Sequence, residues 1–287
     1  MKNLRGKVAV ITGAASGIGE AMAHRFAATG MHLTLVDIES GPLDAVAESL
    51  RSAGTRVLSV VVDVSDGDEM DGLGEAVLSE YGAVHLVCNN AGVAAAGPMW
   101  ELTEADWAFT FGANLWGVIH GVRVFGKRLV EQDEGHFVNT ASMAGLVAPP
   151  GMGAYNVTKY GVVALSETLY ADLRVAQSNV GVSVLCPGFV QTRIWDSERN
   201  RPAHLRNPTD PGNAAEKETA HKALRSVIEN SMPTETIADR VHDAVIGKQL
   251  YIITHEATKP ALENRLRTIL NDQNPDVAAI PLEELVK

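Results

Sequence analysis

Tyr155 and Lys159 lie four residues apart near the start of a stretch, residues 154–177, whose apolar periodicity predicts a helix. Side chains at this spacing share one face of a helix, with Cβ atoms about 5–6 Å apart. A Lys ammonium beside a phenol stabilises the phenolate and lowers the phenol pKa, which is about 10 without a partner. The pair therefore predicts that Tyr155 gives or takes a proton near neutral pH.

Ser142 follows a predicted strand, 13 residues before Tyr155. Its hydroxyl could donate a hydrogen bond to a substrate carbonyl oxygen and hold that oxygen toward the Tyr155 proton. A Tyr and a Lys at this spacing are usually incidental when taken alone. Their combination with Ser142 and with a glycine-rich turn near the N-terminus favours a catalytic group.

The glycine-rich turn, TGAASGIG at residues 12–19, separates the first predicted strand from the first predicted helix. Glycine lets the backbone approach a pyrophosphate without a clashing Cβ, and a helix N-terminus offers unpaired N–H groups to phosphates. Glycine turns also occur for purely structural reasons, but this position after a first parallel strand favours dinucleotide binding. The predicted phosphate-binding residues are Gly13, Ser16, Gly17, Ile18 and Gly19.

Asp37 ends the second predicted strand, 18 residues after Gly19. A carboxylate there can accept hydrogen bonds from the adenosine ribose hydroxyls and would repel a 2′-phosphate. No Arg or Lys occurs at residues 13–16 or at positions 38 and 39. The sequence thus favours NAD over NADP, with a carboxylate that caps the next turn as the alternative.

Asp63 and Val64 follow the third predicted strand. They stand in line with the carboxyl edge of the sheet, where ligands bind in a fold of this kind. Asp63 could contact the adenine, or it could cap the next helix.

Short apolar runs alternate with helical patterns along most of the chain. Strands are predicted at residues 7–12, 32–36, 56–62, 84–88, 136–140, 181–186 and 250–254, and helices at 20–29, 41–53, 68–81, 103–131 and 154–177. This alternation predicts βαβ units, and right-handed crossovers place helices on both faces of the sheet. The predicted fold class is α/β, a doubly wound parallel sheet (Rossmann-like) in a three-layer α/β/α single domain.

The chain is expected to divide into a main domain and a C-terminal extension. Residues 1–254 would form the dinucleotide-binding and catalytic domain. Residues 191–233 are rich in Pro, Asn, Arg and Thr and predict a long loop, so about residues 189–235 would form a substrate lid. Residues 255–287, with an amphipathic stretch at 262–270, would form a helical extension.

Composition limits the partners of the chain. The net charge of −11 disfavours nucleic acid and anionic membranes, which need a basic surface. No stretch reaches the roughly 18 uncharged apolar residues of a membrane span, and no leader pattern is visible, so we expect a cytoplasmic protein. Cys88 and Cys186 are expected to be buried thiols, and no metal site is predicted.

The sequence resembles the short-chain dehydrogenase/reductase family over about residues 7–192. The motifs that match in order are the TGAASGIG turn, Asp63-Val64, Asn89-Asn90-Ala91-Gly92, Asn114, Ser142, Tyr155, Lys159 and Pro187-Gly188-Phe189-Val190-Gln191-Thr192. The resemblance implies a seven-stranded parallel sheet and an NAD-dependent enzyme that interconverts a secondary alcohol and a ketone.

Residue roles follow from this resemblance. Tyr155 would transfer the proton, Ser142 would orient the substrate oxygen, and Lys159 would bind the nicotinamide ribose. Asn114 would hold a water that links Lys159 to solvent, or it could merely bend its helix. The other implied cofactor contacts are Asn90, Pro187, Val190 through its backbone, and Thr192. Residues 89–92 could instead be a turn that locks the sheet, a part that suits Asn89 better.

Small and apolar residues flank the predicted catalytic groups, namely Ala94, Ala96, Ala144, Leu146, Met152, Phe189 and Trp195. They predict a bulky hydrophobic or aromatic alcohol or ketone. Residues 195–206 and the tail from His255 are also similar to dehydrogenases that oxidise the benzylic alcohol of lignin-derived aryl ethers.

The end of the last predicted strand departs from the family pattern. Many family members end the last strand in an Asp-Gly-Gly-like turn, where this chain has LYIITHE at residues 250–256.

The resemblance also implies a homodimer or homotetramer, built through the helices that carry Asn114 and Tyr155. The alternative functions are an NADPH-linked acyl-thioester reductase and a non-catalytic nucleotide-sensing protein.

Overall fold

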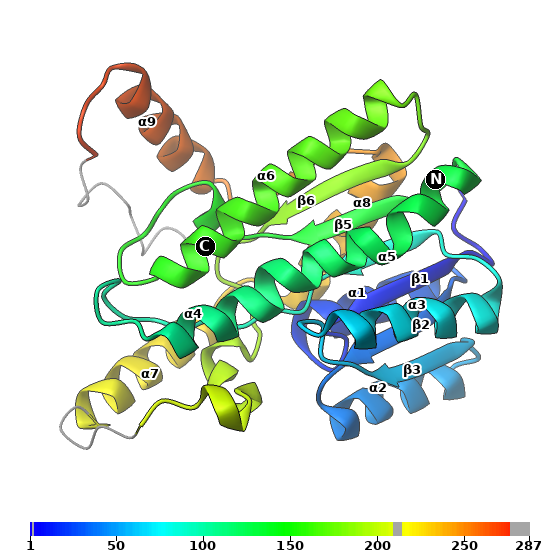
Figure 1. The fold of residues 1–287 in the computed structure, drawn as a ribbon, viewed down its shortest axis with the longest axis horizontal. Coiled ribbons are helices and arrows are strands. Elements are labelled where there is room, and N and C mark those ends of the chain that lie inside the picture. The colour runs from blue at the N-terminus through cyan, green and yellow to red at the C-terminus, as the bar shows by residue number, and fades with distance from the viewer. Residues whose placement is uncertain (2, 209–213, 276–287) are drawn as a thin grey trace.

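Seven parallel strands form one sheet at the centre of the protein, whose computed structural model describes residues 1, 3–208 and 214–275. The strands are β1 (Val8–Thr12), β2 (His32–Asp37), β3 (Val57–Val61), β4 (Leu86–Asn89), β5 (His136–Thr140), β6 (Gly181–Cys186) and β7 (Tyr251–Ile253). Their order is β3-β2-β1-β4-β5-β6-β7 (Figure 1). The predicted doubly wound parallel sheet is confirmed, and its strand order reverses between β1 and β4, where such sheets bind ligands.

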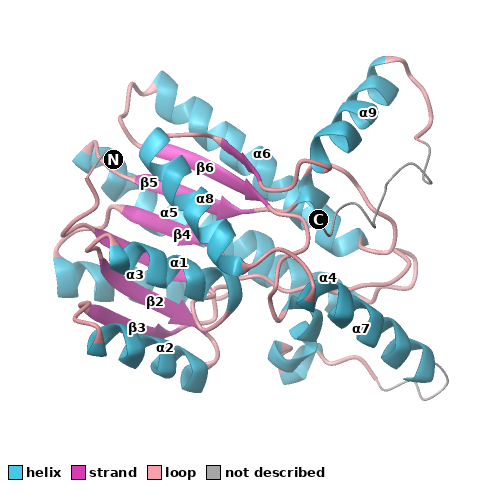
Figure 2. Cartoon of the chain, turned by 180° about the vertical axis from the view of Figure 1, so that it is seen from behind, coloured by secondary structure: helices cyan, strands magenta, loops and turns pink. Residues whose placement is uncertain are grey.

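Helices cover both faces of this sheet. One face carries α1 (Gly17–Ala28), α2 (Ser40–Ser52) and α8 (Thr234–Gly247), as Figure 2 shows from behind. The opposite face carries α3 (Gly67–Tyr81), α5 (Gly117–Gln132) and α6 (Gly153–Val175). The three-layer arrangement is therefore confirmed.

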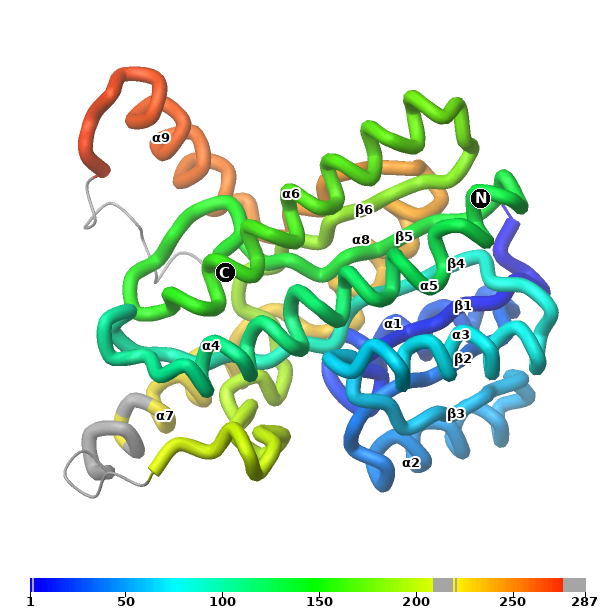
Figure 3. Tube along the Cα trace, viewed as in Figure 1, coloured from blue at the N-terminus to red at the C-terminus, as the bar shows by residue number. Residues whose placement is uncertain are grey.

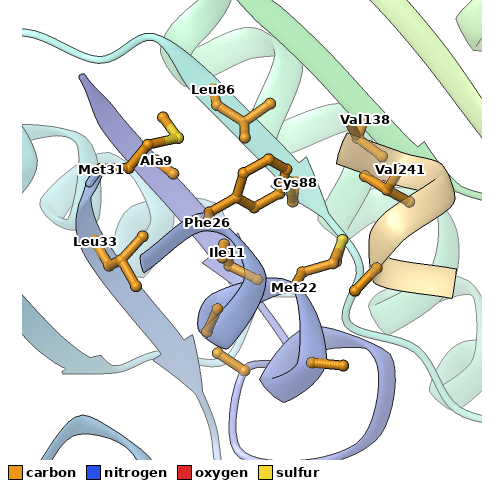
Figure 4. Close-up of a cluster of buried hydrophobic side chains, with 14 of the residues drawn as sticks. Ala9, Ile11, Met22, Phe26, Met31, Leu33, Leu86, Cys88, Val138 and Val241 are labelled. Carbon is orange, nitrogen blue, oxygen red and sulfur yellow. The ribbon is translucent and has the colours of Figure 1, made fainter. Parts of the chain in front are cut away.

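The strands are buried on both sides, so the core is split by the sheet. In β1, Ala9 and Ile11 contact the α1 and α8 layer, whereas Val8 and Val10 contact the α3 and α5 layer. Phe26 of α1 is fully buried at the centre of the first core (Figure 4). Burial of a side chain of this size stabilises the fold by about 1.5–3 kcal/mol.

The helix predicted at residues 103–131 is continuous but irregular. Thr103 caps α4 (Glu104–Phe111) in a capping box with Asp106. A π-helical turn at Gly112–Trp116 then leads directly into α5, so that α4 and α5 run as one tube in Figure 3. Asn114 lies in this π turn.

The segment between β6 and β7 contains more structure than the sequence predicted. The expected loop at residues 191–233 holds short 3₁₀ helices at Ile194–Asn200 and Ala203–Leu205, followed by α7 (Ala214–Glu229). Helix α8 was also not predicted, although Ile237, Val241 and Val245 bury one face of it at helical spacing. The prediction of a loop was therefore wrong for α7, whose Ala-, Glu- and Lys-rich sequence has high helix propensity.

The C-terminal region forms α9 (Thr258–Leu270), which extends away from the sheet (Figures 1 and 2). Leu262 contacts the cluster of Met143 and Val147. Parts of the expected lid, residues 209–213, and of the expected extension, residues 276–287, lie outside the described residues. Among the described residues, no helix combines the length and apolar character needed to cross a bilayer.

Candidate active site

A cavity of about 580 Å³ lies at the carboxyl ends of the strands. Most of the predicted site residues line it, namely Gly13, Ser16, Gly17, Ile18, Asp37, Asp63, Val64, Asn90, Ser142, Tyr155, Lys159, Pro187, Val190 and Thr192. Gly19 and Asn114 do not line it. The fold thus brings together residues that are up to about 180 positions apart, because parallel strands end at the same edge of a sheet.

The glycine-rich turn is shaped by close backbone contacts. Gly13 has a φ of +67°, and a Cβ on it would lie 2.9 Å from Ala91 Cα. A Cβ on Gly19 would lie 1.9 Å from the carbonyl oxygen of Gly13, so Gly19 is needed to seat α1 against the turn. The Ser16 side chain makes no capping hydrogen bond to α1. The turn therefore fits a dinucleotide, because bare backbone and helix N–H groups border the cavity.

Asp37 lies at the cavity end of β2. Its carboxylate accepts hydrogen bonds from the backbone N–H groups of Ala15 and Glu39, each at 3.0 Å. Burial raises the pKa of this carboxyl, while the two backbone hydrogen bonds act in the opposite direction. Asp37 thus braces the glycine-rich turn and also lines the cavity, so the structural and the binding readings are compatible.

Asp63 does not cap α3, so that alternative from the sequence was wrong. Its Oδ1 accepts hydrogen bonds from the backbone N–H and the hydroxyl of Ser65. The cap of α3 is Asp66, which accepts from the N–H groups of Asp68 and Glu69. The N-cap of α3 thus lies three residues after Asp63.

The two asparagines of the Asn89-Asn90 pair have different positions. Asn89 is buried, and its amide donates to Asn139 Oδ1, which agrees with a role in locking β4 to β5. Asn90 lines the cavity, but its amide donates to the Thr12 carbonyl and its Oδ1 accepts from Thr140. Sequence reasoning missed Thr12, whose hydroxyl accepts from the N–H groups of Asn90 and Ala91.

Ser142, Tyr155 and Lys159 converge at one wall of the cavity. Tyr155 lies in the first turn of α6, and an interaction with the Ser142 side chain favours the ionised form of its phenol. The Lys159 ammonium donates to the Thr140 carbonyl at 2.8 Å and lies 5.4 Å from the centroid of the Tyr155 ring. All three residues are buried.

Burial dominates the titration of this group. It raises the pKa of Tyr155 to about 12, and the interaction with Ser142 acts in the opposite direction. It lowers the pKa of Lys159 to about 8. The lowering of the Tyr155 pKa by Lys159 stays a prediction, because desolvation of the phenol is the largest influence on its pKa in this structure.

Asn114 lies behind this wall, in the π turn between α4 and α5. Its Oδ1 accepts from the Val93 N–H at 2.8 Å, and its amide donates to the Val93 carbonyl and to Thr158 Oγ1. A Cβ on Gly92 would lie 3.1 Å from Asn114 Oδ1 and 3.6 Å from Lys159 Nζ. Asn114 therefore joins the segment after β4 to the helix that carries Tyr155 and Lys159.

A family model for short chain dehydrogenases matches residues 7–203, which include the glycine-rich turn and the three converging residues. The chain belongs to the short-chain dehydrogenase family. It is therefore an oxidoreductase, and the resemblance seen in its sequence is confirmed.

Similar proteins agree with this assignment. The dehydrogenase is 37% identical over 279 residues to a CLA biosynthesis dehydrogenase/reductase of Lactiplantibacillus plantarum, covering 96% of this chain and 98% of the relative. It is 33% identical over 193 residues to BbsD of Thauera aromatica, a dehydrogenase subunit named for a hydroxy(phenyl)methyl-succinyl-CoA, covering 67% of this chain and 77% of the relative. A crystal structure of a short-chain dehydrogenase/reductase from Burkholderia phymatum in complex with NAD matches with a TM-score of 0.92 at 45% identity, covering 96% of this chain and 98% of that one.

The outer walls of the dehydrogenase cavity are largely apolar. Ala94, Ala96, Ala144, Met152 and Phe189 line it, as the sequence predicted. Further apolar residues line it as well, including Met143, Pro149, Pro150, Ile194, Leu205, Leu224 and Ile228.

Two residues that were predicted to line the pocket do not. The Trp195 ring lies against two residues of α7. Its centroid is 5.1 Å from the centroid of the His221 ring and 4.7 Å from Arg225 Cζ. Leu146 is buried in the core cluster that contains Val162. Neither is among the residues that line the cavity.

Residues 193–207 hold this part of the chain against the cavity through contacts that sequence reasoning missed. Ser197 Oγ accepts from the Ala94 N–H at 3.0 Å. Arg199 forms an ion pair with Glu39 at 2.8 Å, next to Asp37. The Arg201 guanidinium, only 3% exposed, pairs with Asp106 of α4 at 2.9 Å. These partners are about a hundred or more residues apart, so no local pattern signals them.

Proposed function

We propose that this dehydrogenase interconverts a secondary alcohol and a ketone with NAD(H), and that Tyr155 is the general acid and base. The observation that carries the proposal is the convergence of Ser142, Tyr155 and Lys159 on one wall of a cavity that the glycine-rich turn also borders. Bound NAD would supply the hydride acceptor, and its positively charged nicotinamide would favour the phenolate form of Tyr155.

The chain's own residues account for the proton and for orientation. A substrate oxygen placed between the Ser142 and Tyr155 hydroxyls accepts a hydrogen bond from each in the ketone form. Tyr155 gives its proton to that oxygen during reduction and takes the alcohol proton during oxidation. The Lys159 ammonium would hold the nicotinamide ribose and stabilise the phenolate, and Asn114 would position a water that relays protons from Lys159 to solvent.

The cofactor preference is proposed from the adenosine end of the cavity. Asp37 and Glu39 place two carboxyl groups there, and Glu39 engages Arg199. A 2′-phosphate would meet the Asp37 carboxylate, to which the ribose hydroxyls of NAD could instead donate, while Arg199 is paired with Glu39. Comparison of kcat/KM for NADH and NADPH tests this, and a clear preference for NADPH would overturn it.

The substrate is proposed to be a bulky hydrophobic or aromatic secondary alcohol. The apolar walls favour such a compound, since selection of a polar substrate needs placed polar partners. The name of the Thauera relative contains a hydroxyl on the carbon next to a phenyl ring, which supports benzylic alcohols. Benzylic alcohols of aryl ethers are the first class to test.

A turnover screen with NAD tests the reaction and the substrate class together. Its arms are benzylic aryl ether alcohols, hydroxysteroids, aliphatic secondary alcohols and, with NADPH, a 3-ketoacyl thioester. Turnover of the last arm alone would favour an acyl-thioester reductase.

Tyr155→Phe tests the assignment of the proton-transfer residue. We expect turnover to fall by about a hundredfold to ten-thousandfold while NADH still binds. Unchanged turnover would contradict the role of Tyr155, and an inactive wild type that still binds NADH would favour a nucleotide-sensing protein.

A further inference from the structure

His255 lies two residues after the end of β7, at the place where many relatives are expected to carry a glycine-rich turn. It is buried, with 1% of its surface exposed. Its ring lies against the segment that follows β6, because a Cβ on Gly188 would come within 2.9 Å of the His255 ring. The imidazole therefore lies behind a wall of the cavity rather than within it.

The hydrogen bonds of His255 fit a single neutral tautomer. The Gly188 N–H donates to Nδ1 at 3.0 Å, and Nε2 lies 3.1 Å from the Phe189 carbonyl oxygen. A backbone N–H can only donate and a carbonyl can only accept, so Nδ1 carries the lone pair and Nε2 carries the proton. The Thr254 hydroxyl, 2.8 Å from Nδ1, can donate to the same lone pair.

The segment that this ring holds is joined to the proposed catalytic group. The Pro187 carbonyl accepts from the Met143 N–H at 2.8 Å and from the Ser142 hydroxyl at 3.4 Å. Residues 187–190 also line the cavity. A displacement of Gly188 or Phe189 would therefore reach both the Ser142 hydroxyl and the cavity wall at Val190.

We propose that His255 is a positioning residue, whose neutral imidazole clamps the Gly188 and Phe189 peptide groups and thereby sets the position of the wall next to Ser142 and of the Val190 backbone. The inference rests on the proposed function, since it assigns that wall to the nicotinamide end of the site. In this role His255 acts through the backbone and does not touch the substrate.

Protonation of His255 would disrupt the clamp. It would place an N–H on Nδ1 against the Gly188 N–H, so the clamp exists only while the ring is neutral. Burial lowers the pKa of His255, the bond to Phe189 raises it, and nearby Arg240 lowers it. Arg240 of α8 donates to the Thr254 carbonyl, and the exposed Glu256–Lys259 ion pair follows His255 in the chain at the start of α9. Catalytic activity should therefore fall when the pH is lowered far enough to protonate His255.

Three substitutions of His255 test its hydrogen bonds to Gly188 and Phe189 independently. His255→Asn keeps an acceptor for Gly188, His255→Gln keeps a donor for Phe189, and His255→Leu keeps neither. We expect His255→Leu to lower kcat/KM by about tenfold to a hundredfold, because two peptide groups lose their partners. The Asn or Gln variant should restore part of this loss, and both should lack the acid-side ionisation of the wild type. His24→Leu, at an exposed position of α1, is the matched control.

Two readouts do not depend on turnover. The ¹⁵N NMR spectrum of the His255 ring should show the Nε2–H tautomer at neutral pH, and NADH affinity measured by fluorescence should weaken in His255→Leu. The proposal is overturned if the ring is protonated at neutral pH, or if His255→Leu keeps wild-type NADH affinity and pH profile. A wild type without turnover would refute the proposed reaction, while these two readouts would still decide the role of His255.

Discussion

At the scale of single residues, the fold buries the charged ammonium group of Lys159 away from water. Its ammonium is almost fully buried and donates to one backbone carbonyl, that of Thr140. Burial lowers the pKa of Lys159 from 10.5 to about 8, so the folded protein holds this proton less tightly than the unfolded chain does. The enzyme thus gives up stability at neutral pH to keep a cation beside Tyr155.

The pH dependence of stability follows from this shift. Between the folded pKa of about 8 and the unfolded value of 10.5, the unfolded chain keeps a proton that the folded protein has lost. The free energy of unfolding therefore rises with pH in this window, by up to ~1.4 kcal/mol per pH unit. Below pH 8 both states are protonated and this contribution is constant.

Lys159→Met should remove this dependence. The stability difference between wild type and variant, measured by urea denaturation from pH 7 to 10, should therefore shift in favour of the wild type as pH rises. Lys127→Met, whose side chain is 87% exposed, serves as the control and should give a curve parallel to the wild type. A Lys159→Met curve that is also parallel would contradict the lowered pKa.

At the scale of elements, the chain between β6 and α7 is anchored to α4 by a buried ion pair. The Arg201 guanidinium reaches Asp106, Glu198 and the face of the Phe109 ring, and Asp106 also forms the capping box of α4. Because Arg201 pairs with both Asp106 and Glu198, loss of its guanidinium leaves the buried Asp106 carboxylate without its cation. Truncating one partner of such a buried pair typically costs about 3–5 kcal/mol.

Arg201→Met should therefore loosen residues 194–207. We expect faster cleavage of this segment by thermolysin under native conditions, with little change in the cleavage of the sheet. Arg206→Met, an exposed arginine in the same segment, should leave the cleavage rate at the wild-type value. Equal cleavage rates in the two variants would show that the buried pair does not anchor the segment.

The elements also show which features a sequence can predict. Strands at residues 136–140 and 181–186 were located correctly because short runs of β-favouring residues alternate with helical patterns along the chain. Helix α8 was missed although its buried face is periodic, and α7 was hidden by the Pro- and Asn-rich residues before it. The ion pair of Glu39 with Arg199 could not be predicted, because it depends on how residues 160 positions apart meet.

The site was predictable to the extent that strand ends define it. Ser142, Asp37 and Asn90 follow predicted strands, so their arrival at one edge was expected. The Tyr155 pKa was not predictable, because it depends on how deeply the phenol is buried. His255 stood out in the sequence as a departure, but its hydrogen bonds to Gly188 and Phe189 appear only in the fold.

At the scale of the whole molecule, stability depends on two cores separated by one sheet. Phe26 joins β1, β4 and α8 within the first core (Figure 4). Phe26→Ala should lower the free energy of unfolding by about 3–5 kcal/mol, through lost burial and the cavity left behind. Val175→Ala, at a position that is 85% exposed, is the control for urea denaturation. A loss below about 1 kcal/mol for Phe26→Ala would mean that the core repacks around the gap.

Assembly into a homodimer or homotetramer stays a prediction. Trp116 of the π turn and Val157 and Tyr170 of α6 are exposed hydrophobic residues on the helices that were expected to meet a second copy. Light scattering during size-exclusion chromatography would measure the mass. A monomer at micromolar concentration would contradict the prediction.

The ion pair of Glu39 with Arg199 has a kinetic consequence for the proposed reaction. It joins the segment after β6 to the adenosine end of the cavity, and we expect a bound nucleotide to complete the wall against which the alcohol then binds. Substrates should then bind in a fixed order, the nucleotide first, and the ketone should leave before NADH. Product inhibition would reveal it: NADH should compete with NAD, whereas the ketone should be noncompetitive toward NAD. A bridge between two distant segments would thus set the sequence of events in each catalytic cycle.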